Sequence, residues 1–203
     1  MKTAPNFART VRTLLRERLL DAASDITCAE GWASVTMGKV AARVGVSRQT
    51  VYKELGSKPA LAESLMLRET DRFLAGVGEL VTTTPDPVDA VTAAVRFTLE
   101  SAADNPLLKT VLSGSHGEPD DLLPLLTTGS APVLERGIGV LAPMLHRCHP
   151  HAGLSEAEWR TTVEIMVRLV LSHLVQPTQP IPRVVEELRW VIERVLTRRS
   201  GAE

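Results

Sequence analysis

Aromatic residues are scarce in this chain. Among its 203 residues, Phe and Trp each occur three times and Tyr only once. Because so few rings are available, we expect an aliphatic core, and Ala, Leu and Val are abundant enough to form one. Hydrophobic residues still make up 44% of the chain and charged residues 23%, which is the composition of a globular protein and argues against disorder.

Cysteine and long apolar segments are also lacking. Cys28 and Cys148 are the only cysteines, which excludes a disulfide framework. The N-terminal segment MKTAPNFARTVR lacks the apolar core of a signal peptide. No uninterrupted apolar stretch approaches the roughly 20 residues that a membrane span requires. We therefore expect a soluble, cytoplasmic protein without a membrane partner.

Motifs of catalysis are missing as well. The sequence contains neither a P-loop nor a dinucleotide-binding fingerprint. The segment SGSHG at 113–117 is close to the G-x-S-x-G nucleophile elbow, but Ser113 replaces the first Gly and no strand precedes it. We therefore predict no catalytic residue, no cofactor and no enzymatic activity.

One segment, LHRCHPH at 145–151, is rich in side chains of metal-binding types. It straddles the predicted end of a helix, where the helix dipole favours His and a Pro ends the helix. Zinc sites usually also need a better separated second pair of ligands. We predict no metal site, although the sequence leaves metal binding open for His146, Cys148, His149 and His151.

The net charge of -1 conceals an uneven distribution. Residues 1–58 hold ten Lys or Arg against five acidic residues, a net +5. The remainder holds thirteen against nineteen, a net -6. Such asymmetry suggests that the N-terminal part meets a polyanion. An unevenly charged, solvated surface is the alternative interpretation.

Apolar residues recur at helical spacing, and no strand pattern is found. In the N-terminal part, helices are predicted at 8–30, 37–44, 48–55 and 58–81. Thr36, Ser47 and Ser57 precede the last three helices as N-caps. Gly45 supplies the permissive turn residue between the second and third helices, whose spacing is that of a helix-turn-helix.

Further helices are predicted at 88–103, 106–112, 120–127, 130–149, 155–175 and 184–199, with a kink near Pro143. The segment TTTPDP at 82–87 separates them from the first four. We therefore predict an all-α fold, with a compact three-helix unit at 1–58 and a larger helical unit at 59–203. The boundary falls in the fourth helix.

The third helix has the composition of a helix that reads the major groove. Its inner face offers apolar side chains to the preceding helix, and its outer face offers donors and acceptors to bases. Arg can bond a guanine edge with two hydrogen bonds, Gln an adenine edge, and Thr offers a hydroxyl or a methyl group. The candidates for this outer face are Arg48, Gln49, Thr50 and Lys53.

Other residues suit the phosphate backbone. Thr36 and Ser47 stand at helix N-termini, where hydroxyls and free N–H groups favour phosphate oxygens. Tyr52 can reach a phosphate with its hydroxyl, and Lys58 lies in the first turn of the fourth helix. A short polar surface helix with an exposed Tyr is the alternative interpretation of 47–56.

The stretch TMGKVAARVGVSRQTVYKELGSKPAL at 36–61 resembles the DNA-binding signature of the tetracycline-repressor (TetR) family. The resemblance covers roughly residues 12–62. Its residues are Thr36, Val40 with Ala41, Gly45-Val46-Ser47, Tyr52, Lys58 and Leu61, together with Gly31-Trp32. The family commonly has a second aromatic residue or His after the Tyr, and a Phe where this chain has Leu55. Family contacts at Lys53 and Glu54 therefore do not carry over, and Glu54 is expected to be a solvated acid.

The resemblance implies a helix-turn-helix DNA-binding domain at 1–58 and a ligand-binding and dimerisation domain at 59–203. Such a protein is a homodimer paired through its last two long helices, with recognition helices ~34–36 Å apart on a palindromic double-stranded DNA operator. It also implies a small-molecule effector that moves the fourth helix and releases DNA. Few aromatics favour an apolar or lipid-like effector. The polar residues Arg96, Glu100 and His173 are not assigned to its pocket, whose residues stay unknown.

Three hypotheses follow. The first is a ligand-responsive transcriptional repressor. The second is a family member that activates, or that responds to a protein partner. The third is a helical small-molecule carrier or enzyme that keeps a vestigial helix-turn-helix. Specific, salt-sensitive DNA binding separates the first two from the third.

Overall fold

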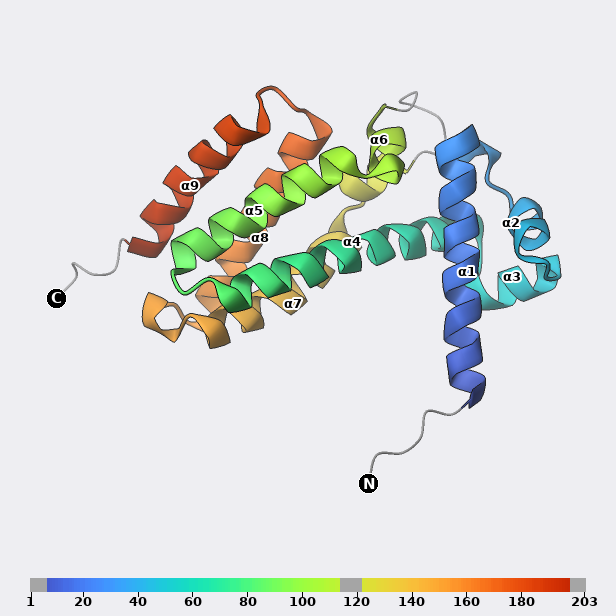
Figure 1. Ribbon diagram of the computed structural model, residues 1–203, viewed down its shortest axis with the longest axis horizontal. Helices are drawn as coiled ribbons and strands as arrows, with labels where there is room; N and C mark the ends of the chain where they lie inside the picture. The colour runs from blue at the N-terminus through green and yellow to red at the C-terminus, as the bar shows by residue number, and fades with distance from the viewer. Residues whose placement is uncertain (1–6, 114–121, 198–203) are drawn as a thin grey trace.

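The computed structural model describes residues 7–113 and 122–197. Every regular element in these two ranges is a helix, which confirms the all-α prediction (Figure 1). The α-helices are α1 (Phe7–Glu30), α2 (Met37–Val44), α3 (Arg48–Leu55), α4 (Lys58–Thr83), α5 (Pro87–Asp104), α6 (Pro106–Ser113), α7 (Ala131–Cys148), α8 (Glu156–Val175) and α9 (Ile181–Thr197). Short 3₁₀ helices are η1 (Trp32–Ser34), η2 (Leu123–Leu126) and η3 (Pro150–Ala152). No helix in the described ranges meets the length and hydropathy needed to cross a membrane.

The N-terminal helices begin where the caps predict. The hydroxyls of Thr36 and Ser47 accept hydrogen bonds of 3.1 Å from backbone N–H groups three residues on, and Ser57 accepts one of 3.5 Å. Gly45 ends α2 in the left-handed conformation at φ 78°, which a residue with a side chain rarely adopts. Local chemistry alone therefore sets the lengths of α2 and α3.

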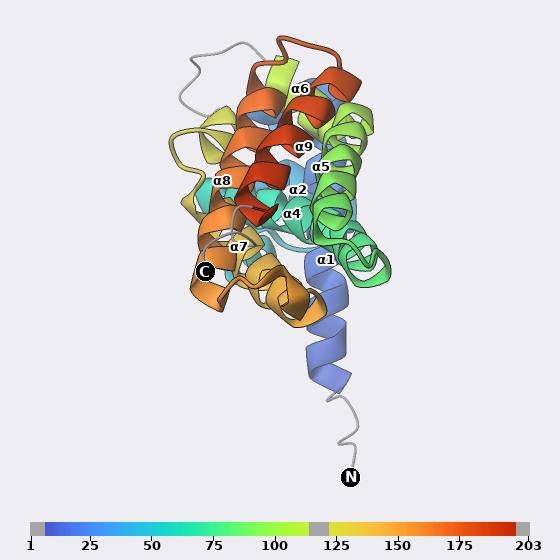
Figure 2. The same cartoon turned by 90° about the vertical axis from the view of Figure 1, so that its left-hand side faces the viewer.

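The helices form two groups that α4 connects. α1, α2 and α3 lie at one end, and α4 runs away from them beside α5 and α7, with α8 packed on α7 and α9 on α5 (Figure 1). Turned by 90°, the molecule shows α1 projecting beyond the helical body (Figure 2). One core cluster lies under α1 to α3, and a second lies among α5, α7, α8 and α9. α4 contributes to both, through Leu61 and Leu65 in the first and Val77 and Val81 in the second.

The division into 1–58 and 59–203 stays a prediction. The first core cluster includes residues from well beyond position 58, among them Leu107, Leu108 and Leu122. Leu107 and Leu108 lie in α6, which packs against α1, and Leu122 lies just before η2. The predicted N-terminal unit therefore shares its core with part of the larger helical unit.

Two predicted helices differ from the structure. The segment predicted as a helix at 120–127 is, in its described part, the single 3₁₀ turn η2. Pro124 accounts for the difference: its ring removes a backbone N–H, and its carbonyl accepts from Thr127 and Gly129 to close a turn. The last helix begins at Ile181 rather than 184, with Pro182 in its first turn. α7 continues through Pro143, and a kink there stays a prediction.

The packing of α4 on α5 depends on Gly76. A Cβ at this position would overlap the ring of Phe97, which lies on α5. We expect Gly76→Ala to lower the free energy of unfolding by about 1–3 kcal/mol, because the ring must move from its site. Gly139 in α7 is a matched control, since no described atom lies within 4 Å of its Cβ position. There Ala should stabilise by about 0.5–1 kcal/mol through helix propensity. Urea denaturation measures the free energy of unfolding of both variants. Equal effects would contradict a close contact between position 76 and Phe97.

Candidate DNA-binding surface and apolar cavity

α3 presents the outer face that the sequence predicts. Val51 and Leu55 are buried against the neighbouring helices, which leaves the opposite side of α3 open. Arg48, Gln49 and Lys53 are exposed on α3, and Thr50 is half-buried. The structure therefore gathers all four candidate base-reading side chains on one short helix.

Tyr52 is the partner of Arg48. The Arg48 Nη2 donates to the Tyr52 hydroxyl over 3.1 Å, and the guanidinium carbon lies 5.4 Å from the ring centroid. Stacking on a ring face and one hydrogen bond hold the guanidinium while leaving its remaining N–H groups available. The Tyr52 hydroxyl accepts this bond, so its own hydrogen can be donated to another acceptor. The only Tyr of the chain thus positions the first Arg of the predicted recognition helix.

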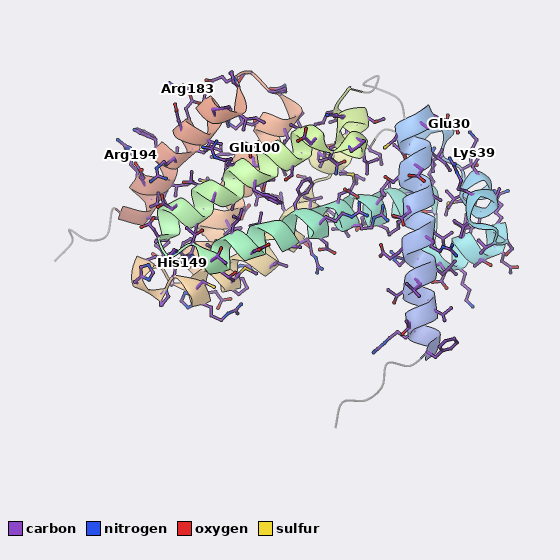
Figure 3. The ribbon with its side chains drawn as sticks, in the orientation of Figure 1. Glu30, Lys39, Glu100, His149, Arg183 and Arg194 are labelled. Carbon is purple, nitrogen blue, oxygen red and sulfur yellow. The ribbon has the colours of Figure 1, made fainter. Side chains whose placement is uncertain are left out.

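The cap hydroxyls of α2 and α3 accept hydrogen bonds from their own helices. The oxygens of Thr36 and Ser47 accept from backbone N–H groups of their helices, so each hydroxyl hydrogen can point outward. Ser47 Oγ also lies 2.9 Å from Thr50 Oγ1. On α2, Lys39 Nζ contacts Glu30 at 2.7 Å, and this hydrogen bond lowers the pKa of the Glu30 carboxyl (Figure 3). The Lys39 ammonium group therefore lies against the C-terminal end of α1.

Lys58 lies beside the turn before α2. Its Nζ is 3.4 Å from the Ala33 carbonyl oxygen and 5.4 Å from the centroid of the Trp32 ring. The ammonium is therefore held at a defined place at the start of α4. A Lys in this position can add a contact to a DNA backbone that passes α3.

Glu54 is not the solvated acid that the sequence predicts. Its side chain is only 9% exposed and accepts a 2.7 Å hydrogen bond from Arg12 Nε of α1. Arg16 of α1 donates to the Glu54 carbonyl over 2.6 Å and to Ser64 over 2.7 Å. These contacts attach α1 to α3 and α4. The prediction failed because α1 is distant in sequence and only folding brings its Arg residues to α3.

The His and Cys side chains of 145–151 do not form a metal centre. In the described residues, no three His, Cys, Asp or Glu side chains converge. His146 Nδ1 lies 3.2 Å from the Leu154 carbonyl, and the rings of His149 and His151 meet edge to face with centroids 5.9 Å apart. Most of the SGSHG segment, residues 114–117, lies outside the described part of the chain.

An apolar cavity of about 140 Å³ lies between α4, α5, α7 and α8. Val, Leu and Met side chains dominate its lining, as the scarcity of aromatics predicts. Its polar lining residues, apart from Trp159, are Glu69, Thr70, Thr98 and Thr162. Arg96 and Glu100 do not line it: both are exposed and face each other at 3.8 Å, and Glu100 lies on the outside of α5 (Figure 3).

Glu69 links this cavity to α1. Its two oxygens accept from Arg72 over 2.7 Å and from Asn105 over 2.9 Å. The neighbouring Arg68 donates to Asp21 of α1 over 2.7 Å and lies 3.8 Å from Glu69. A continuous polar network therefore joins the wall of the cavity to the helix that packs against α2 and α3.

Comparison with known proteins identifies the family. Residues 19–65 match the family described as bacterial regulatory proteins, tetR family. Residues 86–194, more than half of the chain, match the tetracyclin repressor C-terminal domain. The chain belongs to the TetR family. It is thus a DNA-binding transcriptional regulator with a helix-turn-helix, and the predicted resemblance is confirmed.

Individual transcriptional regulators are similar to this chain over most of its length. The transcriptional regulator AlkX of Mycobacterium tuberculosis is 35% identical over 188 residues, which cover 92% of this chain and 87% of that protein. The crystal structure of the TetR repressor AlkX from a Dietzia strain has a TM-score of 0.76 at 27% identity, covering 90% of this chain and 95% of that one. The repressor QsdR of R. erythropolis shares the fold, with a TM-score of 0.65 at 20% identity and coverage of 91% and 95%.

Proposed function

We propose that the protein is a homodimeric repressor that binds a palindromic DNA operator and leaves it when a small apolar effector fills the cavity. We propose no catalytic activity, and we place its action in the cytoplasm with the DNA. The outer face of α3 carries this proposal, because Arg48, Gln49, Thr50 and Lys53 offer the donors and acceptors that base edges require. Thr36, Ser47, Tyr52 and Lys58 would contact phosphates.

Exposed apolar side chains on the last two helices support dimerisation. Ile165 on α8 is 45% exposed, and Trp190 on α9 is 56% exposed. Arg194 covers one face of the Trp190 ring at 3.6 Å, and this Arg projects outward from α9 (Figure 3). Apolar surface of this kind marks interaction sites. A two-fold dimer would place the two α3 helices about 34–36 Å apart, one turn of DNA.

The position of the cavity supports release by an effector. Met66, Glu69, Phe73 and Val77 of α4 line it, and the same helix begins directly behind α3. A ligand that prefers a displaced α4 would shift the dimer to that state in proportion to its differential affinity. The related Dietzia AlkX is a repressor implicated in biodegradation of n-alkanes, which supports an aliphatic effector here.

Fluorescence anisotropy with a duplex from the chain's own upstream region tests the DNA-binding part. We expect tight binding that exceeds binding to a shuffled duplex about 10³-fold or more and falls steeply with salt. Two chains should bind each duplex. Equal, weak binding to both duplexes would contradict operator recognition in this region, and the absence of binding at low salt would remove the proposal.

A further inference from the structure

The cavity wall contains one hydrogen-bond donor without a partner. Trp159 is fully buried, and its indole Nε1 finds no acceptor among the described residues. The three Thr hydroxyls of the wall, by contrast, donate to backbone carbonyls of their own helices over 2.8–2.9 Å. A buried N–H without an acceptor costs free energy, because it loses its bond to water and gains none. The Trp159 N–H is therefore available to a bound molecule.

Trp159 and the only ionisable group of the described wall lie at opposite ends of the cavity. Trp159 stands in the first turn of α8, just after the α7–α8 connection, which lies at the end away from α1 (Figure 1). His149, at the end of α7, marks this place in Figure 3. Glu69 lies in the part of α4 whose side chains reach α1 and Asn105. A ligand anchored at Trp159 therefore extends along α4 toward Glu69.

The charge of the wall disfavours an anionic ligand. No Lys, Arg or His is among its described residues, so the wall offers no cation to pair with a carboxylate, and the one acid of the wall, Glu69, already has Arg72 as its partner. Basic side chains line an adjoining, larger cavity of about 370 Å³, which shares Leu112 and Leu174 with the first and contains Lys109 and His173. The volume of the first cavity, about 140 Å³, resembles that of engineered cavities that bind benzene, which suits a ligand on the order of six to nine non-hydrogen atoms.

We propose that the cavity binds an uncharged alkyl compound with a single hydrogen-bond acceptor, such as a ketone, aldehyde or ester, and that Trp159 Nε1 donates to this acceptor. The inference rests on the proposed role of the cavity as the effector site. Its test measures binding directly, without DNA, so that its failure and that of operator release remain distinguishable.

Titration calorimetry with three probes tests the proposal. Octan-2-one carries an acceptor, 2-methyloctane has the same shape without one, and octanoate is anionic. We expect Trp159→Phe to weaken octan-2-one binding about 3- to 10-fold relative to its effect on 2-methyloctane, the amount of one hydrogen bond. Phe7→Leu, at the exposed start of α1 and outside the cavity, should leave both dissociation constants unchanged. Equal changes for the ketone and the hydrocarbon in Trp159→Phe would overturn the proposal, as would tighter binding of octanoate than of octan-2-one.

A second measurement keeps Trp159 in place, in case Trp159→Phe does not fold. In the double variant Trp32→Phe/Trp190→Phe, Trp159 is the only tryptophan, so the tryptophan emission comes from it alone. A hydrogen bond to the indole N–H should move its emission to longer wavelength on addition of octan-2-one but not of 2-methyloctane. Identical spectra with both probes at saturation would refute the bond to Trp159.

Discussion

Arg48→Ala should reduce discrimination between the operator and a shuffled duplex about 5- to 150-fold. A bidentate contact between Arg and a guanine edge contributes about 1–3 kcal/mol of discrimination, and this variant removes the only guanidinium on α3. The loss should fall mainly on the operator, because non-specific binding depends on phosphate contacts elsewhere. Anisotropy titrations against both duplexes at several salt concentrations measure the ratio.

Lys58→Gln is the matched control for Arg48→Ala. Lys58 lies beside Trp32 at the start of α4 rather than on α3. Its loss should weaken binding to all sequences alike and lower the slope of log K against log salt by about one unit. If Arg48→Ala behaved in this same uniform way, Arg48 would be a phosphate contact and our assignment of the base-reading face would be wrong.

Arg68→Met should lower the free energy of unfolding by about 1.5–3 kcal/mol. The Arg68 side chain is only 9% exposed, and it donates both to the Asp21 carboxylate at 2.7 Å and to the Glu17 carbonyl at 3.4 Å. One hydrogen bond that involves a charged group contributes about this much, and the short bond to Asp21 accounts for most of the effect, since the bond to Glu17 is long. The variant also removes one of the two guanidinium groups beside Glu69, which is itself buried in the cavity wall.

An exposed ion pair of the same helix provides the comparison. Arg136 of α7 contacts Asp71 of α4 at 2.6 Å, with the side chains 51% and 47% exposed. Solvent screens such a pair, so Arg136→Met should change stability by less than about 1 kcal/mol. Urea denaturation of both variants gives the difference. Comparable losses would mean that burial of Arg68 is not what makes its bonds stabilising.

The same two variants also test coupling between the cavity and the DNA-binding unit. A larger effect on operator binding for Arg68→Met than for Arg136→Met would indicate that the network of Arg68 and Glu69 transmits the state of the cavity to α1.

Local chemistry explains why so much of the N-terminal unit is predictable. Ser47 and Gly45 each act on the backbone within three or four residues, so their effect is the same in the sequence and in the fold. Likewise, Val51 and Leu55 recur at helical spacing and are buried, which leaves the predicted outer face of α3 exposed. The roles of the exposed residues stay predictions, because no contact with DNA is part of that local chemistry.

Long-range packing explains what the sequence did not reveal. Arg12 and Glu54 are 42 residues apart, and no spacing rule links them. The cavity collects Val, Leu and Met side chains from α4 to α8 and from η2, and these cannot be distinguished in the sequence from other core residues. Trp159 reads as an ordinary core residue of α8, and only its missing acceptor sets it apart.

The sequence by itself determined the all-helical fold, the limits of α2 and α3 and the composition of the face that α3 exposes. Caps, glycines and apolar periodicity act over a few residues, so they are legible without a structure. Only the tertiary structure decided which side chains enclose the cavity, that Glu54 is tied to α1, and that Glu69 and Arg68 join the cavity wall to α1. Those features depend on distances between helices far apart in the chain, which packing of the whole core establishes.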